Sequence, residues 1–160
     1  MLRKGTRVLS KVGLTKDHCV CGLDCDDYEI ARLKENLENL MTFYDLGSFY
    51  LFKTSKDHYS AVCFSIVTPK ELREIMTISW VDIKQIEALD HLKTIGFRIS
   101  KKHGHLPIPF GVIKRKSKSR KNSSTHIAFF NGLYPLFINE KRDEEWSGIT
   151  FETFENPKVK

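Results

Sequence analysis

Apolar and polar residues alternate with changing periods along the chain, and these periods predict strands and helices in turn. Residues 18–24 are mostly apolar and end in an acid, which is typical of a buried strand. Residues 28–41 place apolar side chains three or four positions apart, which predicts one face of a helix. Residues 48–53 and 59–67 are rich in aromatic and β-branched residues. They predict two strands that form a hairpin or lie side by side.

A capped helix, a second helix and a further strand follow. Thr68-Pro69-Lys70-Glu71 has Thr before the first turn, Pro in its first position and Glu in its third, so it predicts a helix to about residue 76. Residues 82–93 predict a second helix. Residues 95–101 alternate apolar and polar side chains and predict a strand.

The resulting order, β-α-β-β-α-α-β, is the connectivity of a split β-α-β sheet. We therefore predict an α+β fold of the ferredoxin-like or RNA-recognition-motif (RRM) type. An antiparallel sheet would carry its helices on one face and leave the other face for ligands. The 160 residues fit a single domain, residues 1–160. Its core would span residues 18–104, and residues 105–160 would add a basic loop and an apolar, then acidic, extension.

Composition narrows the class of protein. Hydrophobic residues make up 41% and charged residues 29%, which excludes a disordered chain, a collagen-like repeat and a coiled coil. Apolar runs are too short for a membrane helix, and the basic start has no apolar segment behind it, so we expect neither a membrane partner nor a secretory signal. Of the four cysteines, Cys19, Cys21 and Cys25 are crowded together, unlike a disulfide framework. We expect a reduced, cytoplasmic protein.

The net charge of +6 arises in one segment. Residues 114–121 hold six basic residues and no acid, and these six account for the whole excess. The segment is either a solvated loop or a loop that binds nucleic-acid phosphates, which release counterions when they are neutralised. Its basic residues are Lys114, Arg115, Lys116, Lys118, Arg120 and Lys121.

Two carboxylates suggest a metal site. Asp24 and Asp26 stand two positions apart at the end of a predicted strand, so they share one face. Because they repel each other, a divalent cation such as Mg²⁺ or Mn²⁺ would favour the arrangement, with substrate phosphates as further ligands. Capping of the next helix by Asp26 or Asp27 is the alternative.

Three weaker signals lie further along the chain. Residues 54–60 place Ser55 and His58 in a turn that could bind phosphate oxygens or be an ordinary polar hairpin tip. Asp82 follows an apolar pair. Arg98, on a predicted strand with Lys101 and Lys102 after it, could clamp an anion or be ordinary surface charge.

Together these motifs resemble the catalytic palm of the archaeo-eukaryotic primases and primase-polymerases. The resemblance covers residues 18–104: Cys19-Val20-Cys21-Gly22-Leu23-Asp24-Cys25-Asp26 is similar to the first motif of the family, Ser55-Lys56-Asp57-His58 to the second, Val81-Asp82 to the third, and Phe97-Arg98-Ile99-Ser100 to the strand that follows. The second motif departs from the usual Ser-x-His spacing by one residue.

The resemblance implies nucleotidyl transfer in replication or repair, as in a plasmid or virus. Asp24, Asp26 and Asp82 would hold two divalent ions that activate a 3′-hydroxyl and stabilise the leaving pyrophosphate. The residues implied for the incoming nucleoside triphosphate are Ser55, His58 and Arg98, with Lys101 or Lys102. The basic segment would hold a DNA or RNA template.

Other functions remain open at this point. His103-Gly104-His105 with Tyr134 suggests an HUH-type rolling-circle nickase, which uses a similar sheet, one metal ion and a tyrosine nucleophile. A nucleic-acid-binding module without catalysis would need none of the carboxylates. A zinc cluster at Cys19, Cys21 and Cys25 has poor spacing, and packing of these residues in the core is favoured.

Overall fold

The computed structural model describes residues 7–13, 17–26, 29–55, 58–79, 81, 83–92, 95–98, 107–115, 120–135 and 149–153. For residues 7, 8, 26, 55, 97, 98 and 149–153 it describes the backbone. In chain order the elements are β1 (Arg7–Leu9), β2 (Cys19–Asp26), α1 (Ile30–Tyr44), β3 (Phe49–Ser55), β4 (His58–Val67), α2 (Pro69–Ile78), α3 (Ile83–Leu92), β5 (Gly96–Arg98), β6 (Ile108–Arg115), α4 (Ser124–Leu133) and β7 (Ile149–Thr153). None of the described helices is long and apolar enough to cross a membrane.

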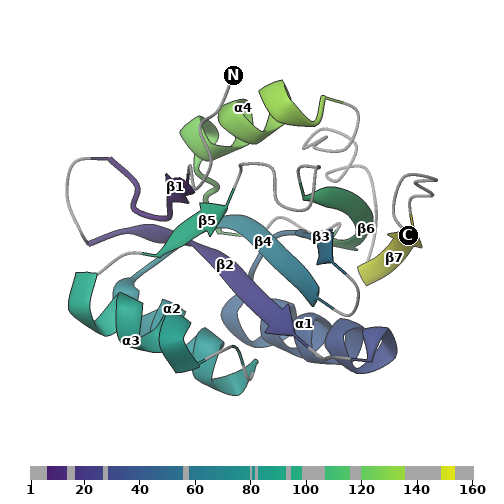
Figure 1. Cartoon of the computed structure of the whole chain (residues 1–160), viewed down its shortest axis with the longest axis horizontal. Coiled ribbons are helices and arrows are strands. Elements are labelled where there is room, and N and C mark those ends of the chain that lie inside the picture. Colours follow the sequence, from purple (N-terminus) through teal and green to yellow (C-terminus); the bar gives the residue numbers. More distant parts are fainter. Residues whose placement is uncertain are drawn as a thin grey trace.

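The fold is α+β, as the sequence predicts (Figure 1). Five antiparallel strands form the main sheet in the order β2-β4-β3-β6-β7. Its first three strands follow the split β-α-β arrangement, with β4 between β2 and β3. The order is therefore compatible with a ferredoxin-like fold.

The predicted last strand departs from the ferredoxin-like order. β5 pairs with β1 in a separate two-stranded sheet instead of joining β2. The outer edge of β2 is already occupied at its start, because Ser10 O accepts a hydrogen bond from Val20 N at 2.9 Å and Val12 N donates to His18 O at 2.8 Å. The main sheet grows at its other edge, where β6 and β7 follow β3.

The two faces of the main sheet are covered differently. Along β2, Leu23 and Cys25 are buried and Asp24 between them is exposed, which is the period of two expected of a strand. Helices α1 and α2 lie on the side of the buried residues, and α4 lies on the opposite side of the sheet (Figure 1). There Phe130 of α4 packs against Phe52 and Phe64, with ring centroids 6.2 and 5.4 Å apart. The face expected to be free for ligands is therefore open over only part of its area.

The four cysteines are free and fully buried in the core. Burial raises the pKa of Cys19 to about 12 and also raises the pKa values of Cys21 and Cys63. Thiols of this kind stay protonated, so Cys19 and Cys21 act as small apolar core residues, as the sequence favours. In the described part of the chain, no group of three Cys, His, Asp or Glu residues could hold a metal ion.

The predicted start of α2 is confirmed in full. Thr68 Oγ1 accepts from Glu71 N at 3.1 Å, and Glu71 Oε1 accepts from Thr68 N at 3.0 Å, which is a capping box with Pro69 in the first turn. Burial alone would raise the pKa of Glu71, but the hydrogen bonds from Thr68 and Arg120 outweigh it and the pKa is lowered. The carboxylate of Glu71 is thus held ionised.

Helix α4 begins at a buried pair, Ser123 and His126, which are 2% and 6% exposed. Ser123 Oγ lies 2.6 Å from His126 Nδ1, and His126 Nε2 lies 2.8 Å from Leu9 O. Since a carbonyl only accepts, Nε2 carries the proton and Nδ1 accepts from the serine hydroxyl. Burial lowers the pKa of His126, so this neutral form is favoured and joins α4 to β1.

Replacing His126 by Gln should flatten the pH dependence of stability below about pH 6.5. Because the pKa of His126 is lowered in the folded chain, its imidazole binds a second proton less readily there than in the unfolded chain. The stabilisation that neutral His126 contributes is therefore complete above about pH 6.5, and it is lost as the pH falls through the lower folded-state pKa. For one proton the wild-type slope approaches about 1.4 kcal/mol per pH unit, measured by urea unfolding at a series of pH values. His91→Gln, on the exposed last turn of α3, is the control. An unchanged slope in His126→Gln would contradict the prediction.

Candidate active site on the open half of the sheet

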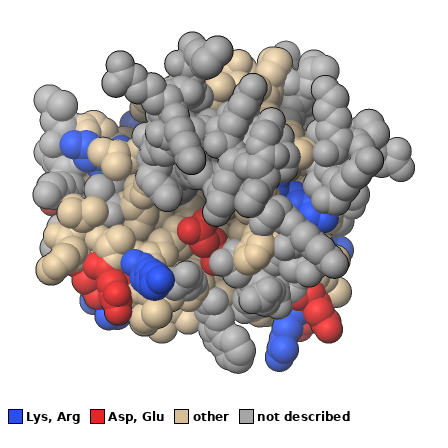
Figure 2. Space-filling view, viewed as in Figure 1, with Lys and Arg blue, Asp and Glu red and all other residues tan. Residues whose placement is uncertain are grey.

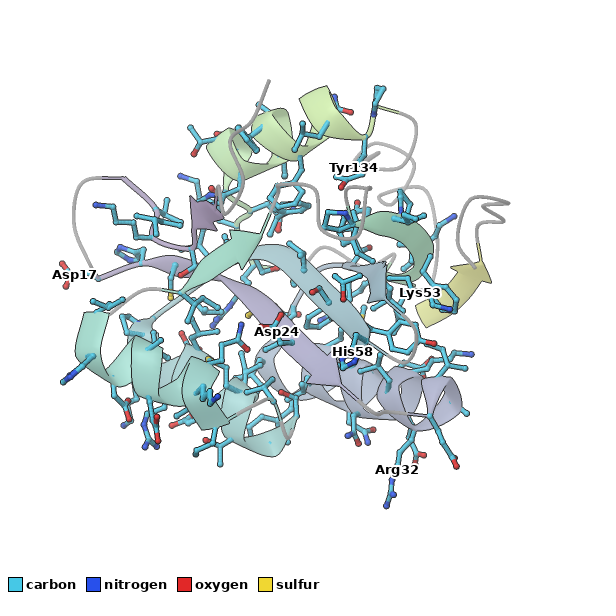
Figure 3. All side chains as sticks on the ribbon, viewed as in Figure 1. Asp17, Asp24, Arg32, Lys53, His58 and Tyr134 are labelled. Carbon is cyan, nitrogen blue, oxygen red and sulfur yellow. The ribbon has the colours of Figure 1, made fainter. Side chains whose placement is uncertain are left out.

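Asp24 lies on the half of the sheet face that α4 does not cover. It pairs with Ser60 of β4, which pairs in turn with Phe52 of β3, so the three residues form one row across the sheet. Phe52 lies at the boundary between the covered and the open half of the face, because its ring packs against Phe130 of α4 whereas Asp24, in the same row, is exposed. Figure 3 shows Asp24 and His58 on the adjacent strands β2 and β4, and Figure 2 shows an acidic group near the centre of this view.

Ser60 holds the Asp24 carboxylate. Its Oγ donates to Asp24 Oδ1 at 3.3 Å across the β2–β4 pair. Ser60 is not among the site residues that the sequence predicts, although it ends the polar stretch 54–60. It stands two positions after His58 on a strand, so the two share a face. Its approach to Asp24 depends on strand register, which links residues 36 positions apart.

The next row brings together three of the predicted residues. His58 pairs with Asp26 on one side and with Ser55 on the other. The β2–β4 ladder runs without a register shift from Cys21 to Asp26, so the backbone positions of Asp24 and Asp26 share a face, as predicted. Asp24 and His58 are diagonal neighbours, which lie roughly 7–8 Å apart in such a pair. The side chains of Asp26 and Ser55 lie outside the described part of the structure.

A helix approaches the same strand from its outer edge. Gln85 of α3 donates from Nε2 to Gly22 O at 3.0 Å and accepts at Oε1 from Asp24 N at 3.2 Å. Asp82 lies outside the described residues, but Ile83, which follows it, begins α3. Gln85 is not among the site residues that the sequence predicts.

The backbone of Arg98 is not joined to this row by strand pairing. The backbone of Arg98 lies in β5, opposite Arg7 of β1, and therefore outside the main sheet. The side chain of Arg98 lies outside the described part, as do Lys101 and Lys102.

The placement of Lys114 and Arg115 in a loop is wrong. Both belong to β6, which lies between β3 and β7, and the side chain of Lys114 is fully buried. The Arg115 guanidinium donates from one nitrogen to Met41 O and Leu46 O, at 2.6 and 2.9 Å, and contacts Asp45 Oδ1 at 2.5 Å from the other. Arg115 therefore satisfies carbonyl groups at the end of α1, where a cation is favourable.

Arg120 has a structural partner as well. Its guanidinium donates to Glu71 Oε2 at 2.9 Å, and its backbone N donates to Asp45 O at 3.2 Å. The chain then runs beside β4, where Ile66 N donates to Lys121 O at 2.8 Å. Of the six predicted basic residues, Lys121 is exposed, and Lys116 and Lys118 lie outside the described residues. The sequence alone does not show which of these basic residues stabilise the fold, because their partners lie far away in the sequence.

Tyr134 is a packing residue in this structure. Its hydroxyl donates to Pro107 O at 2.7 Å, and its ring centroid lies 5.0 Å from that of Phe52. Burial raises the pKa of Tyr134 to about 12, so almost no phenolate forms near neutral pH. These contacts weigh against Tyr134 as the nucleophile of a nickase. His103 and His105 lie outside the described residues.

Comparison of the chain with protein-family models, with curated proteins and with solved structures finds no match.

Tyr134→Phe should lower the free energy of unfolding by about 1 kcal/mol, because the hydrogen bond to Pro107 O is lost and the ring is kept. Urea unfolding measures this change, with Tyr59→Phe on a partly exposed ring as the control. Incubation with single-stranded oligonucleotides should yield no covalent adduct. A denaturation-resistant protein–DNA band that Tyr134→Phe removes would restore the nickase interpretation.

Proposed function

We propose that the protein is a metal-dependent nucleotidyltransferase of the primase-polymerase type, which joins nucleoside triphosphates on a DNA or RNA template. The observation that supports this most is the exposed carboxylate of Asp24, held by Ser60 on the open half of an antiparallel sheet. The backbone of Asp26 and the side chain of His58 belong to the next row of the same face. The order of these residues along the chain resembles the primase motifs.

An oxygen donor of the kind that Mg²⁺ and Mn²⁺ bind is exposed on this face. These ions prefer oxygen ligands, and Asp24 offers a carboxylate that is accessible from solvent. Asp24 would hold the ion, with Asp26 and Asp82 as the further ligands that the primase resemblance implies. When bound, the ion supplies Lewis-acid activation of a 3′-hydroxyl and stabilises the charge that develops on the leaving pyrophosphate.

His58 and Ser55 would bind the triphosphate of the incoming nucleotide. Both lie in the row next to Asp24, and His58 is partly exposed. Imidazole and hydroxyl groups donate hydrogen bonds to phosphate oxygens, and these bonds strengthen when the acceptor is charged. Arg98, Lys101 and Lys102 are the further residues that the primase resemblance implies here.

Asp24→Asn should abolish nucleotide incorporation in the presence of Mn²⁺, with a loss of at least about 100-fold, because a metal ligand contributes several kcal/mol of transition-state stabilisation. The melting temperature should stay unchanged or rise, since repulsion between neighbouring carboxylates is relieved. Extension of labelled primers on a template measures the activity. Asp17→Asn is the matched control, because Asp17 is an exposed aspartate that lies before the start of β2, away from Asp24 (Figure 3).

Full activity in Asp24→Asn would refute the catalytic assignment. If the wild-type chain binds nucleic acid and incorporates no nucleotide, and Asp24→Asn binds equally well, the protein is a binding module without catalysis.

Replacing Lys116, Lys118 and Lys121 by Ala should weaken binding to all DNA and RNA sequences about equally. The dependence of log affinity on log salt should flatten by roughly two to three units, about one for each lost phosphate contact. Arg120 is left in place, because its ion pair with Glu71 belongs to the fold. A variant with Lys34, Lys70 and Lys84 on three helices changed to Ala removes the same charge and is the control. An unchanged slope would mean that these lysines do not contact the template.

A further inference from the structure

Tyr59 and Phe110 form an aromatic pair on the sheet face opposite to Asp24. Tyr59 of β4 pairs with Cys25 of β2, which is buried on the face that α1 and α2 cover, so Tyr59 belongs to that face. The ring centroids of Tyr59 and Phe110 lie 5.4 Å apart, with an angle of 54° between the rings. Because β3 lies between β4 and β6, the two rings meet across that strand. Both rings pack against the core and are partly exposed to solvent.

An irregularity of the sheet places Phe110 beside Tyr59. The β3–β6 register shifts between Leu51 and Phe52, and Phe110 is the residue inserted on β6 at this shift. In a regular ladder Phe110 would stand opposite Phe52, whose ring faces α4. The insertion instead brings the ring of Phe110 to the ring of Tyr59 on the other face. Bulges of this kind commonly redirect a side chain beside a functional site.

Lys53 adds a positive charge to this surface. It pairs with Tyr59 on one side and with Ile108 on the other, so it shares the face of the aromatic pair. Lys53 is partly exposed (Figure 3). We call Tyr59, Phe110 and Lys53 the aromatic surface. Proteins hold single-stranded nucleic acids with this combination, in which bases stack on aromatic rings and basic side chains contact the phosphates.

We propose that the aromatic surface binds an unpaired nucleotide of single-stranded DNA or RNA, with a base stacked on the rings and a phosphate at Lys53. This inference rests on the nucleic-acid partner of the proposed function and is independent of its metal-dependent catalysis. Tyr59 directly follows His58 on β4, so the aromatic surface lies at the same end of the sheet as the proposed nucleotide site and on the opposite face. It therefore contacts the bound strand outside that site and does not bind the incoming nucleotide.

The competing explanation is that the two rings only complete the edge of the hydrophobic core, because both contact it. In that case their loss would lower stability and would leave the nucleic-acid affinity of the folded protein unchanged. A ring that stacks responds to the presence of a base, whereas a lysine responds to the phosphate. Comparison of an ordinary oligonucleotide with one that lacks its bases therefore separates the two explanations.

The test measures binding of a labelled thymidine oligonucleotide, and of the same chain with abasic sites in place of its bases, by fluorescence anisotropy in the presence of a chelator. The wild type should prefer the thymidine chain. Tyr59→Leu should bind that chain about 5- to 150-fold more weakly, which is the range for the loss of one base stack. Its affinity for the abasic chain and its salt dependence should not change, since no phosphate contact is lost. Lys53→Gln should instead flatten the dependence of log affinity on log salt by about 0.7 for both chains.

Phe43→Leu is the matched control. The ring of Phe43 is 79% exposed and lies in the last turn of α1, whereas the first turn of α1 follows the end of β2 that pairs with Tyr59. The two ends of this 15-residue helix are about 20 Å apart. The control therefore removes an exposed ring far from the aromatic surface and should bind both chains as the wild type does.

Two further measurements apply even where Tyr59→Leu unfolds at the assay temperature. Tyr59→Phe keeps the ring and should keep the preference for bases. An oligonucleotide with one 2-aminopurine base should lose fluorescence when it binds the wild type, because stacking quenches that base. Phe110→Leu should reduce this quenching.

The outcomes distinguish this inference from the proposed function. Equal wild-type affinity for the two chains, a preference that folded Tyr59→Leu retains in full, or unquenched 2-aminopurine would refute the aromatic surface and leave the proposed function standing. Absence of binding to either chain in the wild type would refute both.

Discussion

The outer edge of β2 constrains the rest of the structure. Backbone N–H and C=O groups at the edge of a sheet need partners, and a neighbouring strand is the usual solution. Here residues 10–12 cover the start of β2, and the amide of Gln85 covers its second half. β5 pairs with β1 instead of joining this edge. The sheet is extended at its far side by β6 and β7.

The division of the open face follows from the side chains that point to it. Phe52 and Phe64 are large and apolar, and they bury against Phe130 of α4. In the row of Asp24 and Ser60, and in the row of His58 beyond it, the β2 and β4 positions on this face are polar. Helix α4 therefore packs on the half of the face that carries aromatic side chains, and Asp24 is exposed on the other half. The proposed chemistry belongs to this second half.

Basic residues in this chain serve two purposes. Arg115 and Arg120 both contact Asp45, where α1 ends with a left-handed residue, and Arg120 also reaches the cap of α2 through Glu71. Arg115 joins the end of β6 to the end of α1, and Arg120 joins the stretch before α4 to the end of α1 and the start of α2. Residues 114–121, predicted as one phosphate-binding loop, therefore include arginines that stabilise the fold. Lys116, Lys118 and Lys121 are left for the nucleic-acid contact that we propose.

Local pattern predicts several elements of this protein, although not β6, α4 or β7, and long-range contact determines the partners of each element. The helical period of residues 28–41 and the residues Thr68, Pro69 and Glu71 act within a few positions of one another, so the sequence alone predicts α1 and the capped start of α2. The alternation around Asp24 likewise places it on the polar face of a strand. Ser60 and Gln85, by contrast, reach Asp24 from 36 and 61 positions away, and Arg115 reaches Asp45 from 70. Pairing of this kind depends on which strand edges and helix ends remain unsatisfied after the chain has folded. A lysine in a basic run and a lysine buried in β6 look the same in the sequence for that reason, and only the tertiary structure separates them.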